Sequence, residues 1–173
     1  LGLLEKTGID IAGEASTIIH KQENVGEVEL ATMSFGQSFQ ITPLQMLRAA
    51  SAIINGGNLV TPHFAVKSVS EADGTAVEFN YEIQSNAIEE KTSLMMKDIL
   101  RQVVEEGGGK KAYLEGFSIG GKTATSQKLP RGSGKYTSSF IGFSPVDNAK
   151  VIAMCLIDEP QGIYYGGTIA APV

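Results

Sequence analysis

Three strand-like segments follow one another in the last third of the chain, and they constrain the fold more than any other feature. They occupy residues 117–126, 136–144 and 151–158, where apolar and β-branched side chains concentrate. The links between them are short and rich in turn-forming residues, at 130–134 and 145–148. Because a parallel pair needs a crossover of roughly a dozen residues or more, these links predict an antiparallel meander.

A helix is expected immediately after Thr42. Thr42 is a good N-cap, Pro43 suits the first helical position, and Gln45 completes a capping box. Apolar and small residues then recur at helical spacing and give the helix one apolar face, formed by Leu44, Leu47, Ala50, Ser51 and Ile54. The run Asn55-Gly56-Gly57 predicts its end, since glycine accepts a left-handed conformation there.

The rest of the chain is expected to form a loop-rich start, a hairpin and a second helix. Residues 1–40 show no sustained period. Residues 59–69 and 75–83 are expected to pair around an Asp73-Gly74 turn. Alternation predicts a half-buried second strand, through Val77, Phe79, Tyr81 and Ile83. A helix over 89–106 is expected to share one apolar face among Leu94, Ile99, Leu100 and Val103.

Composition indicates one globular domain and excludes some functions. Hydrophobic residues make up 42% and charged residues 19% of 173 residues, and the net charge of -5 does not favour nucleic acid as a partner. The longest apolar run, 151–157, is far shorter than the ~20 residues that span a bilayer. The opening residues show no signal peptide, and an opening without Met suggests an excised segment. The one cysteine, Cys155, lies in that apolar run and is interpreted as a buried small hydrophobe.

Residues 116–123 match the pattern Gly, four residues, Gly-Lys-Thr, which is that of a phosphate-binding loop. Such a loop works between a buried strand and a helix. Here no apolar strand precedes the pattern, and no amphipathic helix follows it before Lys135. A nucleotide hydrolase is therefore the weakest of three candidate functions.

The same residues also fit a strand that carries Lys-Thr-x-Thr, at 122–125. Alternate strand residues share a face, so Thr123 and Thr125 are expected to point one way and Lys122 the other way, or along the edge. Two hydroxyls and an ammonium at one end of a cleft suit a peptide with a carboxylate, and an edge strand can pair with an extended peptide. Gly120 and Gly121 are expected to permit close approach. A bland exposed strand is the alternative.

The segment around this motif resembles the third motif of penicillin-binding proteins, the Lys-Thr-Gly element. Further segments, in order along nearly the whole chain, are similar to that family: 5–14, 35–38, 41–45, 55–57, 62–63, 139–145 and 165–172. The chain most resembles the C-terminal part of the transpeptidase domain in class B members, of the Gram-positive division and sporulation type. The resemblance implies an α/β (α+β) fold with an antiparallel sheet flanked by helices, here an incomplete transpeptidase domain over 1–173.

The sequence departs from the family pattern in two ways. Ala124 stands where the family usually has Gly, and its Cβ either crowds a substrate on the strand or is a tolerated variant. No Ser is followed by Lys three residues on or by Asn two residues on, so the nucleophile, its lysine base and the middle motif are expected upstream of Leu1. Lys6-Thr7-Gly8 spells the third motif outright, but it lies in a turn-like stretch and matches a different family segment.

The resemblance implies a serine-type D,D-transpeptidase, an acyltransferase of peptidoglycan synthesis that uses neither metal nor cofactor. Lys122 then contributes positive field, Thr123 and Thr125 bind the substrate carboxylate with Ala124 beside them, and the Thr125 backbone N–H forms half of an oxyanion hole. This chain alone is expected to be inactive.

The implied partners are D-Ala-D-Ala stem peptides, β-lactams and cell-wall synthesis proteins, with self-association of the fragment left open. The implied location is the outer face of the cell membrane. A non-catalytic β-lactam sensor or interaction module of the same fold is the second candidate. His20 and His63 stand alone and are interpreted as structural.

Overall fold

The computed structural model describes residues 1–130 and 132–173. Its centre is a three-stranded antiparallel sheet in the order β5-β6-β7, formed by Gly120–Gln127, Tyr136–Ser144 and Val151–Asp158. The predicted meander is confirmed, although its first strand begins three residues later than expected. Arg131, within the expected link 130–134, lies outside the described residues.

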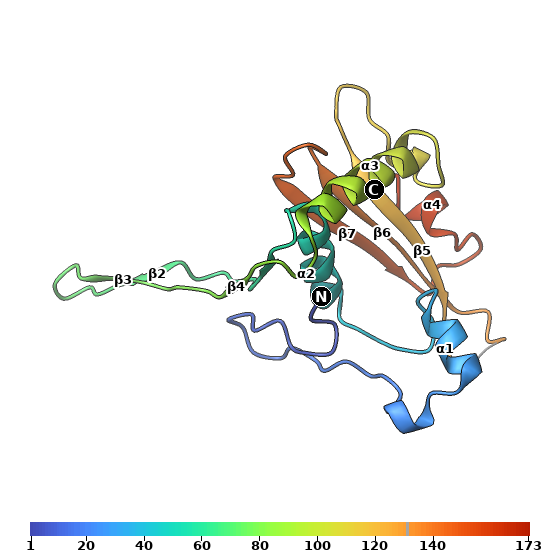
Figure 1. Cartoon of the computed structure of the whole chain (residues 1–173), viewed down its shortest axis with the longest axis horizontal. Coiled ribbons are helices and arrows are strands. Elements are labelled where there is room, and N and C mark those ends of the chain that lie inside the picture. The colour runs from blue at the N-terminus through green and yellow to red at the C-terminus, as the bar shows by residue number, and fades with distance from the viewer. Residues whose placement is uncertain (131) are drawn as a thin grey trace.

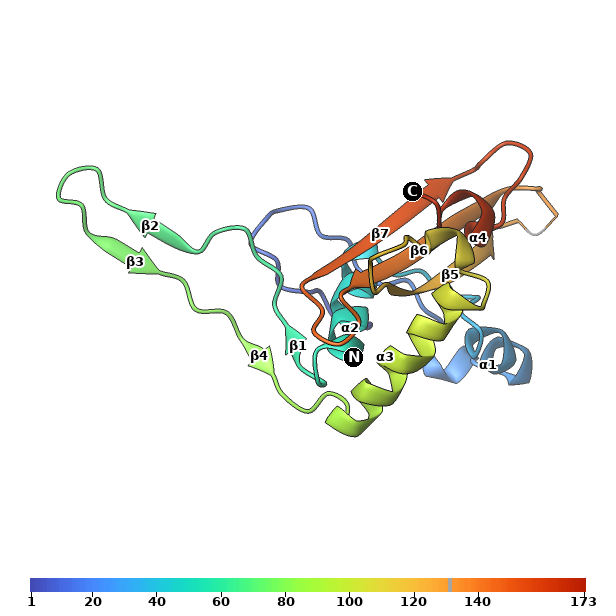
Figure 2. The ribbon, with the colours of Figure 1, turned by 90° about the horizontal axis from the view of Figure 1, so that it is seen from above.

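Two helices lie beside the sheet (Figures 1 and 2). Helix α2, Pro43–Ile54, has the predicted Thr42 N-cap: Gln45 N–H donates to Thr42 Oγ1 at 3.1 Å, and Thr42 N–H donates to Gln45 Oε1 at 2.8 Å. Helix α3, Glu90–Glu105, runs close to β5. Its predicted apolar face is only partly right, because Leu94 is 56% exposed while Leu100 and Val103 face the sheet side.

The sheet carries a separate apolar cluster on each face. Phe143 packs with Ile54 of α2 and Val146 on one face. Phe140 packs with Val104 of α3 and with Ala170 and Ala171 on the other. The second face is covered by a short helix, α4, Gly166–Ile169. Burying a Phe side chain contributes about 1.5–3 kcal/mol to stability. The two rings therefore help to hold the sheet against the elements packed on its two faces. Cys155 is partly buried beside Phe140, close to its expected setting.

The predicted hairpin is a long arm that projects from the body in both views (Figures 1 and 2). At its base β1, Leu59–Val60, pairs with β4, Ile83–Gln84; further out β2, Lys67–Val69, pairs with β3, Ala76–Glu78. The expectation of half-burial holds for Tyr81 but is wrong for the other three alternating residues. Val77, Phe79 and Ile83 are 44–59% exposed, because the body does not reach the arm.

The start of the chain is less irregular than expected, because it contains a 3-10 turn, η1 at Gln22–Asn24, and helix α1 at Glu27–Met33. Its first residues are tied to α2 by Gln45, whose side chain is 1% exposed. Gln45 Nε2 donates to Glu5 O at 2.7 Å and to Thr17 Oγ1 at 2.8 Å. A second 3-10 turn, η2 at Lys110–Ala112, links α3 to β5. Within the described residues, no helix is long and apolar enough to cross a membrane.

Candidate active site

The Lys122-Thr123-Ala124-Thr125 segment lies in the middle of β5, and its side chains alternate between the two faces of the sheet. Lys122 and Ala124 line a cavity on the α2 and α3 side. Thr123 and Thr125 face α4. The predicted alternation is therefore confirmed. A phosphate-binding loop is excluded, because Lys122 is held in a strand and not at the start of a helix.

The outer edge of β5 carries no strand partner within the described residues, since β5 pairs only with β6. An edge strand presents unpaired backbone groups to which an extended peptide can add. The glycines that begin β5 serve a different purpose from the expected one. A Cβ on Gly120 would lie 2.4 Å from the Phe143 ring, and one on Gly121 would lie 2.4 Å from the Phe140 ring. Their close approach is thus to the two core aromatics.

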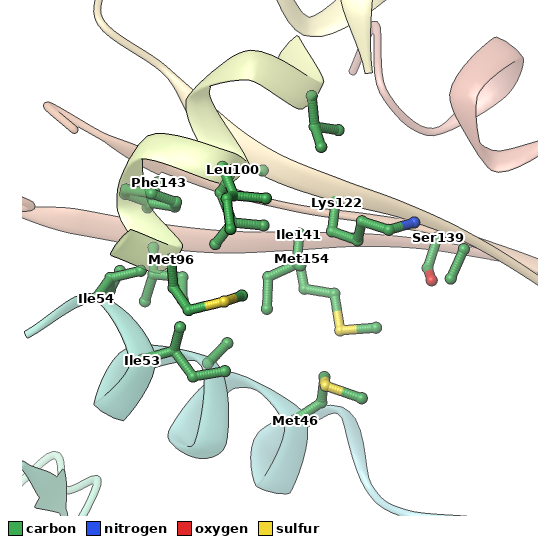
Figure 3. Close-up of a pocket in the computed structure, with 16 residues that line it drawn as sticks. Met46, Ile53, Ile54, Met96, Leu100, Lys122, Ser139, Ile141, Phe143 and Met154 are labelled. Carbon is green, nitrogen blue, oxygen red and sulfur yellow. The ribbon is translucent and has the colours of Figure 1, made fainter. Parts of the chain in front are cut away.

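The cavity beside Lys122 has a volume of about 440 Å³ (Figure 3). Its lining is almost wholly apolar and comes from α2, α3 and all three strands, including Met46, Met96, Leu100, Ile141 and Met154. Lys122 extends toward Ser139, the polar residue of the lining, and away from the labelled Met and Ile side chains. Its Nζ donates to the Thr123 carbonyl oxygen at 2.7 Å and stays exposed. The Lys122 ammonium therefore lies at the polar end of an otherwise apolar cavity.

Thr125 is fixed by the segment that follows β7. The Gly166 backbone N–H donates to Thr125 Oγ1 at 3.0 Å. Thr123 is enclosed more loosely: a Cβ on Gly167 would lie 3.5 Å from its Cγ2, and one on Gly108 would lie 3.9 Å from its Oγ1. Both threonines are half-buried, so their hydroxyls lie at the border between the protein and solvent.

Two neighbours of the motif were not expected from the sequence. Gln37 Nε2 donates to Ser126 Oγ at 3.4 Å, which brings the loop after α1 to the end of β5. Beyond it, Lys128 Nζ lies 2.9 Å from Asp158 Oδ2 and 2.9 Å from Glu159 Oε1. Hydrogen bonds to Asp158 and then to Glu159 raise the pKa of Lys128. The contact with Lys128 lowers the pKa of each carboxyl in turn.

The Lys6-Thr7-Gly8 triplet and the two histidines lie outside strand β5. Lys6-Thr7-Gly8 lies in a loop, where Thr7 is buried and its N–H donates to Glu14 Oε1 at 2.7 Å. His20 is exposed, and the His63 ring stacks on Tyr81 with centroids 3.9 Å apart. Over the part of the chain that is described, no cluster of three or more His, Cys, Asp or Glu residues is placed to hold a metal ion.

Comparison with known proteins assigns these features to one family. The model described as the penicillin binding protein transpeptidase domain matches residues 1–173. Stage V sporulation protein D of Bacillus subtilis is 41% identical over 179 residues, which cover 99% of this chain and 27% of that protein. Peptidoglycan D,D-transpeptidase FtsI of Escherichia coli is 31% identical over 177 residues, which cover 99% of this chain and 28% of FtsI.

Solved structures agree with the sequence comparison. Apo penicillin-binding protein 3 from Mycobacterium tuberculosis superposes with a TM-score of 0.87 at 28% identity, over 99% of this chain and 41% of that one. The same protein complexed with ampicillin gives 0.86 at 26% identity, over the same shares. The expected fold class is confirmed. The chain spans 27% to 41% of the length of these relatives.

Proposed function

The chain belongs to the penicillin-binding-protein transpeptidase family, and from this premise we propose that it supplies the substrate-binding strand of a peptidoglycan D,D-transpeptidase. The observation that carries the proposal is the edge strand β5. It presents an exposed ammonium on one face, two half-buried hydroxyls on the other, and a backbone edge without a strand partner in the described chain.

The proposed reaction is acyl transfer in two steps. A serine Oγ attacks the carbonyl carbon of the penultimate D-Ala, the peptide bond to the terminal D-Ala breaks, and that D-Ala leaves as an amine that takes up a proton. An amine of a second stem peptide then attacks the serine ester, which forms the cross-link and returns the serine hydroxyl. The serine is supplied by the rest of the parent protein.

Each residue of the motif has a proposed role in the first step. Lys122 provides positive field beside the nucleophile, and Thr123 and Thr125 hydrogen-bond the substrate's terminal carboxylate. The Thr125 backbone N–H donates to the oxyanion that forms on the attacked carbonyl. One such donor is worth about 3–4 kcal/mol of transition-state stabilisation in comparable sites. Ala124 lines the cavity beside them.

We place the nucleophile-bearing segment of the parent against the cavity next to Lys122. Two features support this placement: the apolar lining suits the packing of a further element, and the ammonium lies at the rim where a serine and its lysine base need it. The chain itself contains no Ser-x-x-Lys. An active site is therefore complete only with both parts, and residues 1–173 form its substrate-binding portion.

The parent is proposed to act on D-Ala-D-Ala stem peptides at the outer face of the cell membrane and to react with β-lactams. One relative of known structure, penicillin-binding protein 3, is complexed with ampicillin and with aztreonam, which supports the last point. Ala124 in place of glycine favours a second candidate, a non-catalytic β-lactam sensor of the same fold.

Mass spectrometry after incubation with penicillin tests the proposal. We expect an adduct on a serine of the parent protein and none on this chain alone. An adduct on residues 1–173 would contradict the proposed division of the site. An acylated parent that releases no D-Ala from a stem peptide would instead support the sensor.

A further inference from the structure

Two hydroxyls on neighbouring strands form hydrogen bonds with the backbone of the segment that leads into α4. Thr125 of β5 and Ser138 of β6 are cross-strand partners on the same face of the sheet. Thr125 Oγ1 accepts from the Gly166 N–H at 3.0 Å, and Ser138 Oγ donates to the Tyr164 carbonyl oxygen. Ser138 is completely buried, at 0% exposure. The chain from Tyr164 to Gly166 is thus held at two points, one of them on the motif strand.

Gly166 lies close against the backbone of β5 and β6. A Cβ on Gly166 would lie 2.2 Å from the Ala124 carbonyl oxygen and 2.6 Å from that of Ser139, so only glycine fits against this backbone. Gly166 also begins α4, and a helix leaves its first N–H groups without partners inside the helix. Tyr165 provides no side-chain cap. Thr125, on the face of the sheet that α4 covers, therefore accepts the Gly166 N–H in place of a local cap.

This contact decides what the Thr125 hydroxyl can offer to a ligand. A hydroxyl has one proton to donate and two lone pairs that accept. Since one lone pair of Oγ1 receives the Gly166 N–H, the proton of Thr125 points away from Gly166. Across the residues that the structure describes, Thr125 Oγ1 takes part in this hydrogen bond alone, and only as acceptor. Its proton remains available for an anion at the edge of β5.

We propose that Ser138 is a positioning residue for transpeptidation. By holding the Tyr164 carbonyl, it aims the Gly166 N–H at Thr125 Oγ1 and so reserves the Thr125 proton for the carboxylate of the acyl donor. Ser138 touches no substrate and acts only through this chain of contacts. The inference rests on the proposed function for its substrate, whereas the geometry of the contacts does not depend on it.

The first test measures hydrogen exchange of the Gly166 amide in this chain. Ser138→Ala removes the donor to Tyr164, so Gly166 is expected to exchange about tenfold faster, the loss of one buried hydrogen bond. Ser138→Cys keeps a side chain of similar volume and a weak donor. Its Gly166 exchange rate is expected to lie between those of the unaltered chain and Ser138→Ala. Ser144→Ala is the matched control, because it removes another hydroxyl of β6 whose bond goes to the Ser118 carbonyl oxygen. Unchanged Gly166 exchange in both Ser138 variants would overturn the proposal.

The second test compares acylation of the parent protein by penicillin and by its methyl ester, which lacks the carboxylate charge. Ser138→Ala is expected to lower the acylation efficiency with penicillin about tenfold, mainly through weaker binding. With the methyl ester, the same variant is expected to lose little. Equal losses with both compounds would mean general damage to the fold and would contradict the proposal. If the unaltered parent is not acylated at all, the proposed function fails, while the exchange measurement still decides the role of Ser138.

Discussion

The side-chain amide of Gln45 donates a hydrogen bond of 2.7 Å to the carbonyl oxygen of Glu5, across 40 residues of sequence. The same amide reaches Leu3 O at 3.4 Å and Thr17 Oγ1 at 2.8 Å, while Oε1 accepts the Thr42 N–H. One buried side chain therefore caps α2 and holds the opening loop against it. The N-cap motif that marks the helix in the sequence is also a tertiary anchor.

Gln45→Leu is expected to lower the free energy of unfolding by about 2–3 kcal/mol, because it breaks part-buried hydrogen bonds to the backbone and removes half of the capping box. Urea denaturation followed by circular dichroism measures this change. Gln22→Leu, at an exposed position of η1, is the control and should change stability little. Equal effects of the two substitutions would show that Gln45 anchors nothing.

Lys122→Met is expected to reduce β-lactam acylation of the parent protein by roughly 100-fold or more, because it removes the charge that we propose to face the reacting groups. The unfolding midpoint of the chain should hardly change, since the ammonium is exposed. Stopped-flow acylation kinetics provide the measurement, with Lys111→Met on η2 as the control. An unchanged acylation rate in Lys122→Met would show that Lys122 has no role in acylation.

Ala124→Gly is expected to lower the free energy of unfolding by about 0.5–1 kcal/mol, the usual cost of glycine within a strand. Equilibrium denaturation of this chain measures it. In the parent, the same variant separates the two explanations of Ala124. Faster acylation by penicillin means that the Cβ crowds the ligand, and an unchanged rate means that the alanine is tolerated.

Asp10 ties the base of the arm to the opening loop, and its contribution should depend on pH. Hydrogen bonds from the Ala65 and Phe64 N–H groups and from the Tyr81 hydroxyl hold the pKa of Asp10 below its usual 3.8. A carboxyl with a lowered folded pKa stabilises the fold above its unfolded pKa and loses that effect as pH falls through the folded one.

The stability difference between the unaltered chain and Asp10→Asn should therefore be constant near neutral pH. It should shrink below pH 3.8 and become constant again once Asp10 is protonated in both states. Denaturation at a series of pH values follows it, and the Phe64 amide shift reports the same titration. A difference that grows as the solution becomes more acidic would contradict the assignment.

Lys128→Met is expected to raise the pKa of both Asp158 and Glu159, since hydrogen bonds to Lys128 are the main reason that both values are low. Carboxyl carbon shifts followed by NMR give the two titrations. Lys150→Met removes a lysine that forms no ion pair with either carboxyl in the described chain, and it should leave them unchanged.

Local signals in the sequence were sufficient to predict the elements whose limits depend on neighbouring residues alone. The Thr42 cap and the Asn55-Gly56-Gly57 stop defined α2, because capping depends on residues within one turn. The alternation along 122–125 correctly separated Lys122 from the two threonines, because strand periodicity holds whatever packs on the strand.

Features that depend on distant parts of the chain were missed. Helix α1 has no buried face, so it has no apolar period to detect. The alternation of Val77 and Phe79 predicted a half-buried strand, but periodicity does not reveal whether anything covers the face. The hydrogen bond from the Gly166 N–H to Thr125 Oγ1 joins residues 41 apart, and no local pattern encodes it. The chemical roles of Lys122, Thr123 and Thr125 stay predictions.

The meander also has a consequence for the order in which the molecule forms. The strands β5, β6 and β7 follow one another within residues 120–158, so the pairs between them close short loops. The bonds of Gln45 to Glu5 and of Gly166 to Thr125 close loops of about 40 residues, which carry a larger entropic cost. The motif strand is thus expected to pair early in folding, and the contacts that give Thr125 its orientation are expected to form late.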